Sequence, residues 1–173
     1  VSHILRSYKD EKILVVISAM GKTTNALEKV VEAFYEKQND EALQLFEKIK
    51  QDHLAIANQL IDKPRLNNSV GQALSQLTDF FTEVEWLLHD KPVKDIDYYY
   101  DQIVCEGELL SSSIVSAFLH SEKIKNTWID VRDVIRTDDN FRDANVDMVF
   151  TETKINESIK AIFADTNMII TQG

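Results

Sequence analysis

The pattern of apolar residues along the chain predicts strands and helices in alternation. Runs of successive apolar residues are typical of strands buried in a parallel sheet. Such runs predict strands at 12–18, 128–131 and 167–171, and a short one at 146–150. Apolar residues three or four positions apart predict helices with one buried face. By that spacing, helices are expected at 2–9, 24–35, 43–60, 70–88, 103–120 and 151–164, the last with Ile155, Ile159, Ile162 and Phe163 facing inward.

Two of these helical stripes are long and lie next to each other in the chain. The first runs through Leu43, Phe46, Ile49, His53, Ile56 and Leu60, and the second through Val70, Leu74, Leu77, Phe81, Val84 and Leu88. The segment Lys63-Pro64-Arg65 breaks the chain between them. We expect a long helical hairpin, two antiparallel helices packed face to face beside a sheet. A coiled coil that binds a partner protein is the alternative.

Helices that alternate with apolar strands imply an α/β fold, a largely parallel sheet with helices on both faces. The length of 173 residues, without an internal repeat, a low-complexity tract or an interior linker, predicts one domain. The chain begins with Val1 and ends with Gly173 directly after an apolar strand. We therefore expect it to be a piece of a longer protein.

Charge and cysteine content narrow the class of protein. A net charge of −10 argues against a surface for nucleic acid or for an anionic membrane. The single Cys105 excludes an internal disulfide, and with no secretory leader and no long apolar segment it favours a soluble cytoplasmic protein. No pair of the four histidines has metal-ligand spacing, so we predict no zinc site. We interpret Cys105 and His53 as core residues rather than catalytic ones.

The most informative segment is residues 18–25 (SAMGKTTN), which lies between an apolar strand and an amphipathic helix. A helix N-terminus offers free N–H groups and the positive end of the peptide dipole, which favour phosphates and carboxylates. Gly21, Lys22 and Thr23 fit the second half of a P-loop, but Val16 stands where its first glycine belongs. A simple helix N-cap built from these hydroxyls is the other interpretation.

Two further polar segments follow predicted apolar elements. Glu106-Gly107-Glu108 places two carboxylates around a glycine where a helix begins or is interrupted, and a carboxylate there could hold an ammonium group. Helix-terminal charge is the structural alternative. Residues 130–133 and 136–141 follow the strand at 128–131, where parallel folds bind ligands, although a solvated loop has the same composition.

Four motifs together resemble the aspartokinase family. They are residues 15–25 (VVISAMGKTTN), 107–111 (GELLS), 130–141 (DVRDVIRTDDNF) and 169–173 (IITQG). They occur in that family's order, and the resemblance spans nearly the whole chain. It implies the amino-acid-kinase fold, a three-layer α/β/α sandwich that is incomplete here.

The resemblance also implies a reaction, the transfer of the ATP γ-phosphoryl group to the side-chain carboxylate of L-aspartate, with Mg²⁺ as a requirement. Ser18 and Thr24 would line the aspartate site, Glu108 would hold the substrate ammonium, and the loop at Phe141 would close over the amino acid. Gly21, Lys22, Thr23 and Gly173 would form the surrounding turns. No catalytic residue and no metal ligand is assigned within the chain.

The family's first phosphate-binding segment, most of its nucleotide site and its ACT domains are expected outside this sequence. We therefore predict that the parent protein is a cytoplasmic, homo-oligomeric aspartate kinase of lysine, threonine and methionine biosynthesis, and that residues 1–173 alone are inactive. The competing hypotheses are a divergent P-loop nucleotide-binding protein and a non-catalytic interaction module built on the helices between Leu43 and Leu88.

Overall fold

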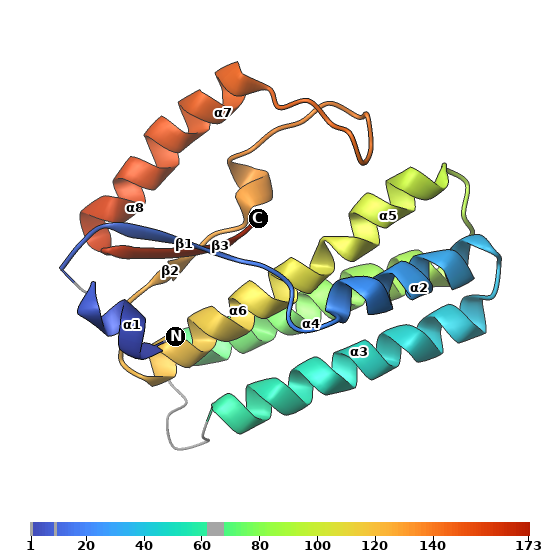
Figure 1. Ribbon diagram of the computed structural model, residues 1–173, viewed down its shortest axis with the longest axis horizontal. Helices are drawn as coiled ribbons and strands as arrows, with labels where there is room; N and C mark the ends of the chain where they lie inside the picture. The colour runs from blue at the N-terminus through green and yellow to red at the C-terminus, as the bar shows by residue number, and fades with distance from the viewer. Residues whose placement is uncertain (1, 9, 62–67) are drawn as a thin grey trace.

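Helices dominate the computed structural model, which describes residues 2–8, 10–61 and 68–173 (Figure 1). The helices before the second strand are α1 (Ser2–Ser7), α2 (Thr23–Tyr35), α3 (Asn39–Leu60), α4 (Asn68–His89), α5 (Ile96–Val104) and α6 (Glu106–Ser121). After it come a 3₁₀ turn η2 (Val131–Asp133), α7 (Met148–Lys154), a π-helical turn η3 (Ile155–Ile159) and α8 (Lys160–Asp165). The strands are β1 (Ile13–Ile17), β2 (Thr127–Trp128) and β3 (Met168–Gln172).

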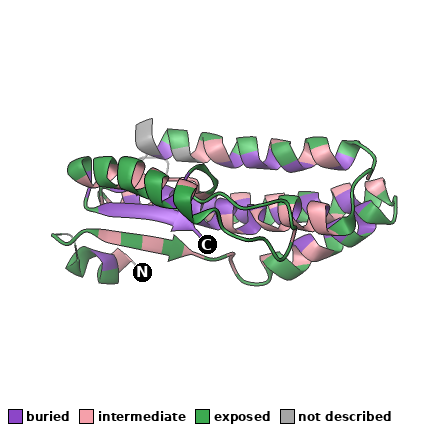
Figure 2. Ribbon diagram, turned by 90° about the horizontal axis from the view of Figure 1, so that it is seen from above, coloured by how far each residue is buried: buried purple, intermediate pink, exposed green. Residues whose placement is uncertain are grey.

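The three strands form one parallel sheet in the order β1-β3-β2. All residues of the central strand β3 are buried, as the purple arrow in Figure 2 shows. Helix α6 contacts all three strands, and α8 also contacts β3. The predicted parallel sheet is thus confirmed, although it is small and the chain is mainly helical.

Strand β1 is less buried than its sequence predicts. Its five successive apolar residues indicate burial on both faces, but Leu14 and Val16 are 51% and 57% exposed. They alternate with Ile13, Val15 and Ile17, which are half-buried against the core cluster around Leu119 and Ile170. Because β1 lies at one edge of the described sheet, it has a neighbouring strand on one side only.

Helix α6 lies close to the sheet because small polar residues occupy its buried face. Ser111, Ser112, Ser113 and Ser116 are all buried. Two of these serines bond to residues at and before β2: the indole Nε1 of Trp128 donates to Ser112 Oγ over 2.9 Å, and Ser116 Oγ donates to Asn126 Oδ1 over 2.7 Å. Buried hydroxyls need such partners, so these contacts fix how α6 sits on the strands.

The predicted helical hairpin is not confirmed as a face-to-face pair. Both helices form, and α3 meets α4 where the rings of Phe46 and Phe81 pack edge to face with centroids 6.2 Å apart. Most of α3, however, packs against α2, and most of α4 packs against α6. The break at Lys63-Pro64-Arg65 lies outside the described residues.

The strand predicted at 146–150 is wrong. Val146 makes a single bridge to Thr137, and α7 begins at Met148. Asp147 explains the change, since its carboxylate accepts a hydrogen bond from the backbone N–H of Phe150 over 3.0 Å and so caps the helix. The π-helical turn that follows widens the helix, and Ile155 is 43% exposed instead of facing inward.

The expectation that the chain has no long apolar segment also needs correction. The continuous helical stretch Ile96–Ser121 is long and apolar enough to cross a membrane by length and composition alone. Two thirds of its apolar window (67%) is buried inside the protein, as in the core helix of a globular domain.

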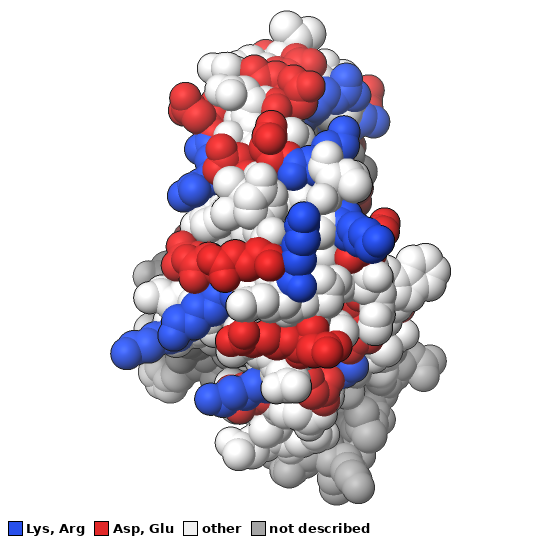
Figure 3. Space-filling model, turned by 90° about the vertical axis from the view of Figure 1, so that its right-hand side faces the viewer, with Lys and Arg blue, Asp and Glu red and all other residues white. Residues whose placement is uncertain are grey.

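The charged residues on the face shown in Figure 3 are of both signs and interleave.

The first turns of α2 and α6 approach closely at Gly107. A Cβ atom built on Gly107 would lie 3.1 Å from Leu27 Cδ1, 3.1 Å from Thr23 Cγ2 and 3.2 Å from Ala19 Cβ. These distances are tighter than ordinary van der Waals contacts. Glycine at position 107 therefore allows the segment after β1 to rest directly on α6.

We expect Gly107→Ala to destabilise the protein by about 1–3 kcal/mol, because the added methyl group overpacks this contact. The matched control is Gly71→Ala in α4, where an added Cβ would meet nothing within 4 Å. There, alanine should stabilise the helix by about 0.5–1 kcal/mol. Urea unfolding of both variants measures the difference. Equal stability of the two variants would contradict the close approach.

Candidate functional site

Three polar segments meet at the carboxyl edge of the sheet. Ser18 follows β1, Asp130 follows β2, and Gly173 follows β3. Since the strands are parallel, these positions lie at the same edge, where open α/β sheets bind ligands. The first turn of α6, which carries Glu106 and Glu108, faces them.

Ser18, Glu108 and Gly173 are brought together. Ser18 Oγ donates to Glu108 Oε1 over 3.3 Å, and Ser111 Oγ donates to the backbone carbonyl of Ser18 over 2.6 Å. A Cβ built on Gly173 would lie 3.4 Å from Glu108 Oε2, so this carboxylate lies beside the end of β3. Glu108 is half-buried and Ser18 is exposed, which leaves both within reach of a small ligand.

The loop between β1 and α2 is held by backbone conformation rather than by hydroxyl caps. Gly21 adopts a φ of 57°, which favours glycine. Thr23 Oγ1 donates to the Met20 carbonyl over 2.7 Å. Lys22 is the N-cap residue of α2 and makes no side-chain cap bond within the described chain. Thr24 is exposed in the first helical turn. The alternative of a simple N-cap built from the Ser and Thr hydroxyls is thus wrong, because the cap position is Lys22 and no side chain of the described residues makes a cap bond there.

A second polar network lies beside Glu108. Gln172 Nε2 donates to Asp130 Oδ1 over 2.7 Å, which joins the ends of β3 and β2. Asp130 also receives a bidentate pair of bonds from Arg132, whose Nη2 lies 2.6 Å from Oδ2. Arg132 Nη1 in turn lies 3.7 Å from Glu106 Oε1. The arginine therefore links a half-buried carboxylate to a buried one.

Glu106 is a buried carboxyl group with an incomplete set of partners. It is 2% exposed, and its Oε2 atom makes no hydrogen bond within the described residues. Burial raises the pKa of Glu106 to about 8, although Arg132 opposes the shift. Burial also raises the pKa of the neighbouring Cys105 thiol to about 12, which keeps it protonated and unreactive at neutral pH. That fits the prediction that Cys105 is a core residue.

Phe141 lies in a different place from the other predicted site residues. Its ring packs edge to face on Tyr98 of α5, with centroids 5.1 Å apart. The next residue, Arg142, donates its backbone N–H to Asp101 over 2.8 Å and stacks its guanidinium on Tyr100. The loop thus rests on α5, whereas Ser18, Glu108 and Gly173 meet at the start of α6.

Sequence reasoning missed two contacts that shape the site. The bond from Ser111 to the Ser18 carbonyl could have been suspected, because Ser111 lies three residues after Glu108 on the same helical face. The bond from Gln172 to Asp130 has no local signal, since it depends on which strands are neighbours. Metal binding finds no support here, because no group of three or more His, Cys, Asp or Glu residues could hold an ion in the part of the chain that is described.

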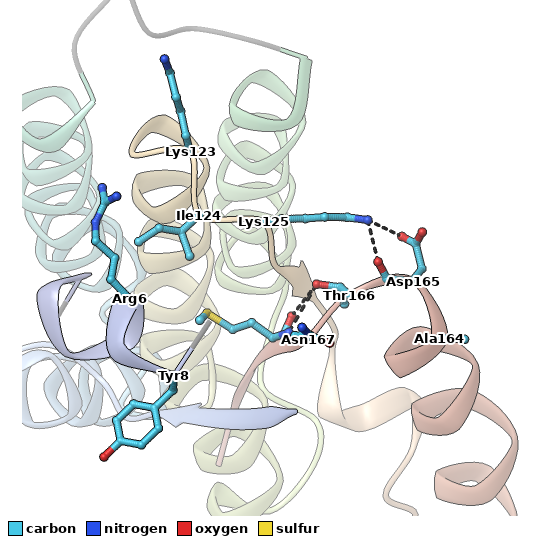
Figure 4. Close-up of a pocket in the computed structure, with 10 residues that line it drawn as sticks. Arg6, Tyr8, Lys123, Ile124, Lys125, Ala164, Asp165, Thr166 and Asn167 are labelled. Carbon is cyan, nitrogen blue, oxygen red and sulfur yellow. Dashed lines mark hydrogen bonds and ion pairs between the residues drawn. The ribbon is translucent and has the colours of Figure 1, made fainter. Parts of the chain in front are cut away.

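A separate hollow lies at the opposite, amino-terminal edge of the sheet (Figure 4). It has a volume of about 340 Å³ and contains the cations Arg6, Lys123 and Lys125. Arg6 pairs with Glu122 over 3.1 Å, and Lys125 pairs with Asp165 over 3.2 Å. Figure 4 shows Lys123 pointing away from the hollow. Arg6 and Lys125 are thus already paired within the protein.

The fold and this edge define a class, an α/β protein that presents a polar site at the ends of parallel strands. No protein-family model matches the sequence. The chain is similar in sequence to aspartokinases. It is 29% identical over 150 residues to aspartokinase 2, chloroplastic, of Arabidopsis thaliana, which covers 84% of this chain. It is 26% identical over 161 residues to lysine-sensitive aspartokinase 3 of Escherichia coli, which covers 92% of this chain.

The fold is also that of part of an aspartokinase. Crystal structures of E. coli aspartokinase III, with lysine and aspartate or with aspartate and ADP, match 99% of this chain with a TM-score of 0.75 at 24% identity. The chain spans 26% of the length of the plant relative and 33% of the length of the E. coli relative. The plant relative is chloroplastic by name, so the predicted cytoplasmic location is not confirmed.

The raised pKa of Glu106 predicts a pH-dependent stability. In the unfolded chain this carboxyl loses its proton near its ordinary pKa of 4.5, whereas the folded protein holds the proton to about 8. Its contribution is therefore fully present below about pH 4.5 and is lost as the pH rises towards 8. Relative to Glu106→Gln, the wild type should lose on the order of a few kcal/mol of unfolding free energy between pH 5 and 8.

Urea unfolding at several pH values measures this difference. The exposed Glu152→Gln on α7 is the control, and its stability should follow the wild type at every pH. Parallel curves for the wild type and Glu106→Gln would show that Glu106 ionises normally in the fold.

Proposed function

We propose that this chain forms the aspartate-binding part of an aspartate kinase, which transfers the ATP γ-phosphoryl group to the side-chain carboxylate of L-aspartate. The observation that carries the proposal is the meeting of Ser18, Glu108 and Gly173 at one edge of the sheet. These residues come from three separated segments, and each belongs to a motif that resembles aspartokinases. The similarity of sequence and fold supports the same assignment.

The chemistry of the edge suits an α-amino acid. Glu108 offers a carboxylate to the substrate ammonium, and its bond to Ser18 holds it in position. Thr24, exposed in the first turn of α2, offers a hydroxyl and the helix N-terminus to a substrate carboxylate. The glycine at position 107 brings that first turn against α6. We propose that Glu108 binds the ammonium end of the amino acid and that Thr24 with the start of α2 binds a carboxylate end.

We also propose that residues 1–173 are part of a catalytic domain with the amino-acid-kinase fold, a three-layer α/β/α sandwich. In this arrangement α6 and the helices behind it form one layer and α7 with α8 the other. The loop at Phe141 would have to move from Tyr98 towards α6 to close over the amino acid.

ATP and Mg²⁺ belong to the proposed reaction, but the carboxyl edge of the sheet offers few groups that could bind them. Phosphoryl transfer needs the two anionic reactants to be neutralised and aligned. At the edge described here, Arg132 is already paired with Asp130 and Glu106. This leaves Lys22 as the cation without an ion pair among the described residues, so few groups remain to neutralise a triphosphate. We propose that the nucleotide and its metal bind mainly to other parts of the enzyme, and that this chain by itself positions aspartate without phosphorylating it.

We expect Glu108→Gln to weaken the binding of L-aspartate about tenfold or more, because a charge-assisted hydrogen bond to the ammonium is lost. Isothermal titration calorimetry on the chain measures the dissociation constant. The control is Asp133→Asn, an exposed acid on η2 near the same edge, which should leave the affinity within about twofold of the wild type.

Succinate separates the ammonium contact from the overall charge of the site. It has both carboxylates of aspartate but no ammonium, so Glu108→Gln should not weaken succinate binding and should strengthen it slightly. An equal loss of affinity for aspartate and succinate would mean that Glu108 acts only on the structure of the loop. An unchanged aspartate affinity would remove Glu108 from the site.

A further inference from the structure

A groove of about 830 Å³ lies between α2 and α3, next to the loop that joins Ser18 to α2. One wall comes from the end of that loop and the start of α2, from Met20 to Lys29. The other wall comes from one face of α3, between Leu45 and Ile56. Its volume is more than twice that of the hollow at the amino-terminal edge of the sheet, and its walls do not include Ser18, Thr24, Glu108 or Gly173.

The groove contains a buried histidine with an unsatisfied nitrogen. His53 is 3% exposed, and its Nδ1 lies 2.8 Å from the carbonyl of Ile49, one turn earlier in α3. That contact requires Nδ1 to carry the proton. Nε2 lies across the ring from this bond and makes no hydrogen bond within the described residues. A buried acceptor without a donor is unfavourable and marks a place for a ligand.

The tautomer determines what His53 can bind. Burial lowers the pKa of His53, so the ring is neutral at physiological pH. A neutral ring with the proton on Nδ1 leaves a lone pair on Nε2. The missing partner is therefore a donor, such as a hydroxyl or an N–H group.

The rest of the groove combines apolar walls with positive charge. Apolar side chains, Met20 and Ala26 on one side and Leu45, Ile49 and Ile56 on the other, line it. Three lysines, Lys22, Lys29 and Lys48, lie among the lining residues, against the single acid Asp52. In a chain with a net charge of −10, this local excess of positive charge favours an anion.

We propose that the groove between α2 and α3 binds an amphipathic organic anion that carries a hydrogen-bond donor on its apolar end. The donor bonds to Nε2 of His53, the apolar body lies along Ile49 and Ile56, and the anionic group faces Lys29 and Lys48. A hydroxylated aromatic carboxylate has this chemistry.

Occupancy of the groove would reach the proposed aspartate site through shared residues. Met20, Gly21 and Lys22 line the groove and belong to the loop that follows Ser18, and Thr23, which also lines it, begins α2 next to Thr24. The anion is thus an effector that changes aspartate affinity by fixing this loop. This coupling rests on the proposed function, whereas binding of the anion in the groove does not.

The test titrates the chain with three probes of similar size and follows backbone amide shifts by NMR. The probe with all the required groups is 3-(4-hydroxyphenyl)propionate. The probe 3-phenylpropionate lacks the hydroxyl donor, and tyramine replaces the carboxylate with an ammonium. We expect saturable shifts along α2 and α3 with the first probe, about three- to tenfold weaker binding of the second, and no saturable binding of tyramine.

Variants locate the binding site. Lys29→Gln and Lys48→Gln together should weaken the hydroxylated probe several-fold and make its affinity less dependent on salt. Lys91→Gln, an exposed lysine outside the groove, is the matched control and should bind like the wild type. His53→Phe keeps a ring of similar size and should abolish the preference for the hydroxylated probe over 3-phenylpropionate.

A measurement on the wild type does not depend on the folding of His53→Phe. The ¹⁵N shift of His53 Nε2 should move upfield when the hydroxylated probe binds, because the lone pair then accepts a hydrogen bond, and should not move with 3-phenylpropionate. Equal affinity for the two carboxylates, binding of tyramine, or shifts away from α2 and α3 would overturn the proposal. Aspartate binding is measured in a separate titration, so that a failure of the proposed aspartate site does not affect the result for the groove.

Discussion

The close approach of α2 to α6 at Gly107 is the constraint on which the candidate site depends. Side chains from the segment after β1 fill the space that a Cβ atom at this position would need. Because the glycine stands between Glu106 and Glu108, the same contact that packs the helices also sets both carboxylates. The glycine therefore connects the core to the polar edge of the sheet, and the loop rests on α6 through side-chain packing and through the bond from Ser111 to the Ser18 carbonyl.

The two carboxylates differ because their surroundings differ. Glu108 is half-buried, bonds to Ser18 and remains available to a ligand. Glu106 points into the protein, where burial outweighs the attraction of Arg132, which is shared with Asp130. The arginine, in turn, connects to β3 through Asp130 and Gln172. A neutral carboxyl behind a charged one limits the negative charge that collects at the place where an anionic substrate would bind.

The sequence predicted the local features of single helices and strands better than it predicted which of these elements pack together. Consecutive apolar residues identified β1 and β3, and Gly107 indicated a place where a helix begins or is interrupted, because these signals lie within a few residues. Neighbouring helices could not be predicted in the same way. The stripes of α3 and α4 fit each other as well as they fit α2 and α6, and only the complete fold distinguishes these pairings. The last helical segment was predicted to begin at 151 rather than at Met148, because Asp147 was not recognised as its cap. In the candidate site, Ser18, Glu108 and Gly173 come from three of the four motifs and lie near one another, which periodicity alone would not have predicted, whereas Phe141 of the remaining motif lies on α5.

The open face of β1 affects how the protein behaves in solution. Leu14 and Val16 are more than half exposed, and they sit on a strand whose outer edge has no partner among the described residues. A strand of another chain can pair with such an edge, and burial of the apolar side chains would stabilise that pairing. The high negative charge of the molecule opposes such encounters by repulsion. That protection is electrostatic, so it weakens as dissolved ions screen it, and colloidal stability of this chain depends on the ionic strength around it.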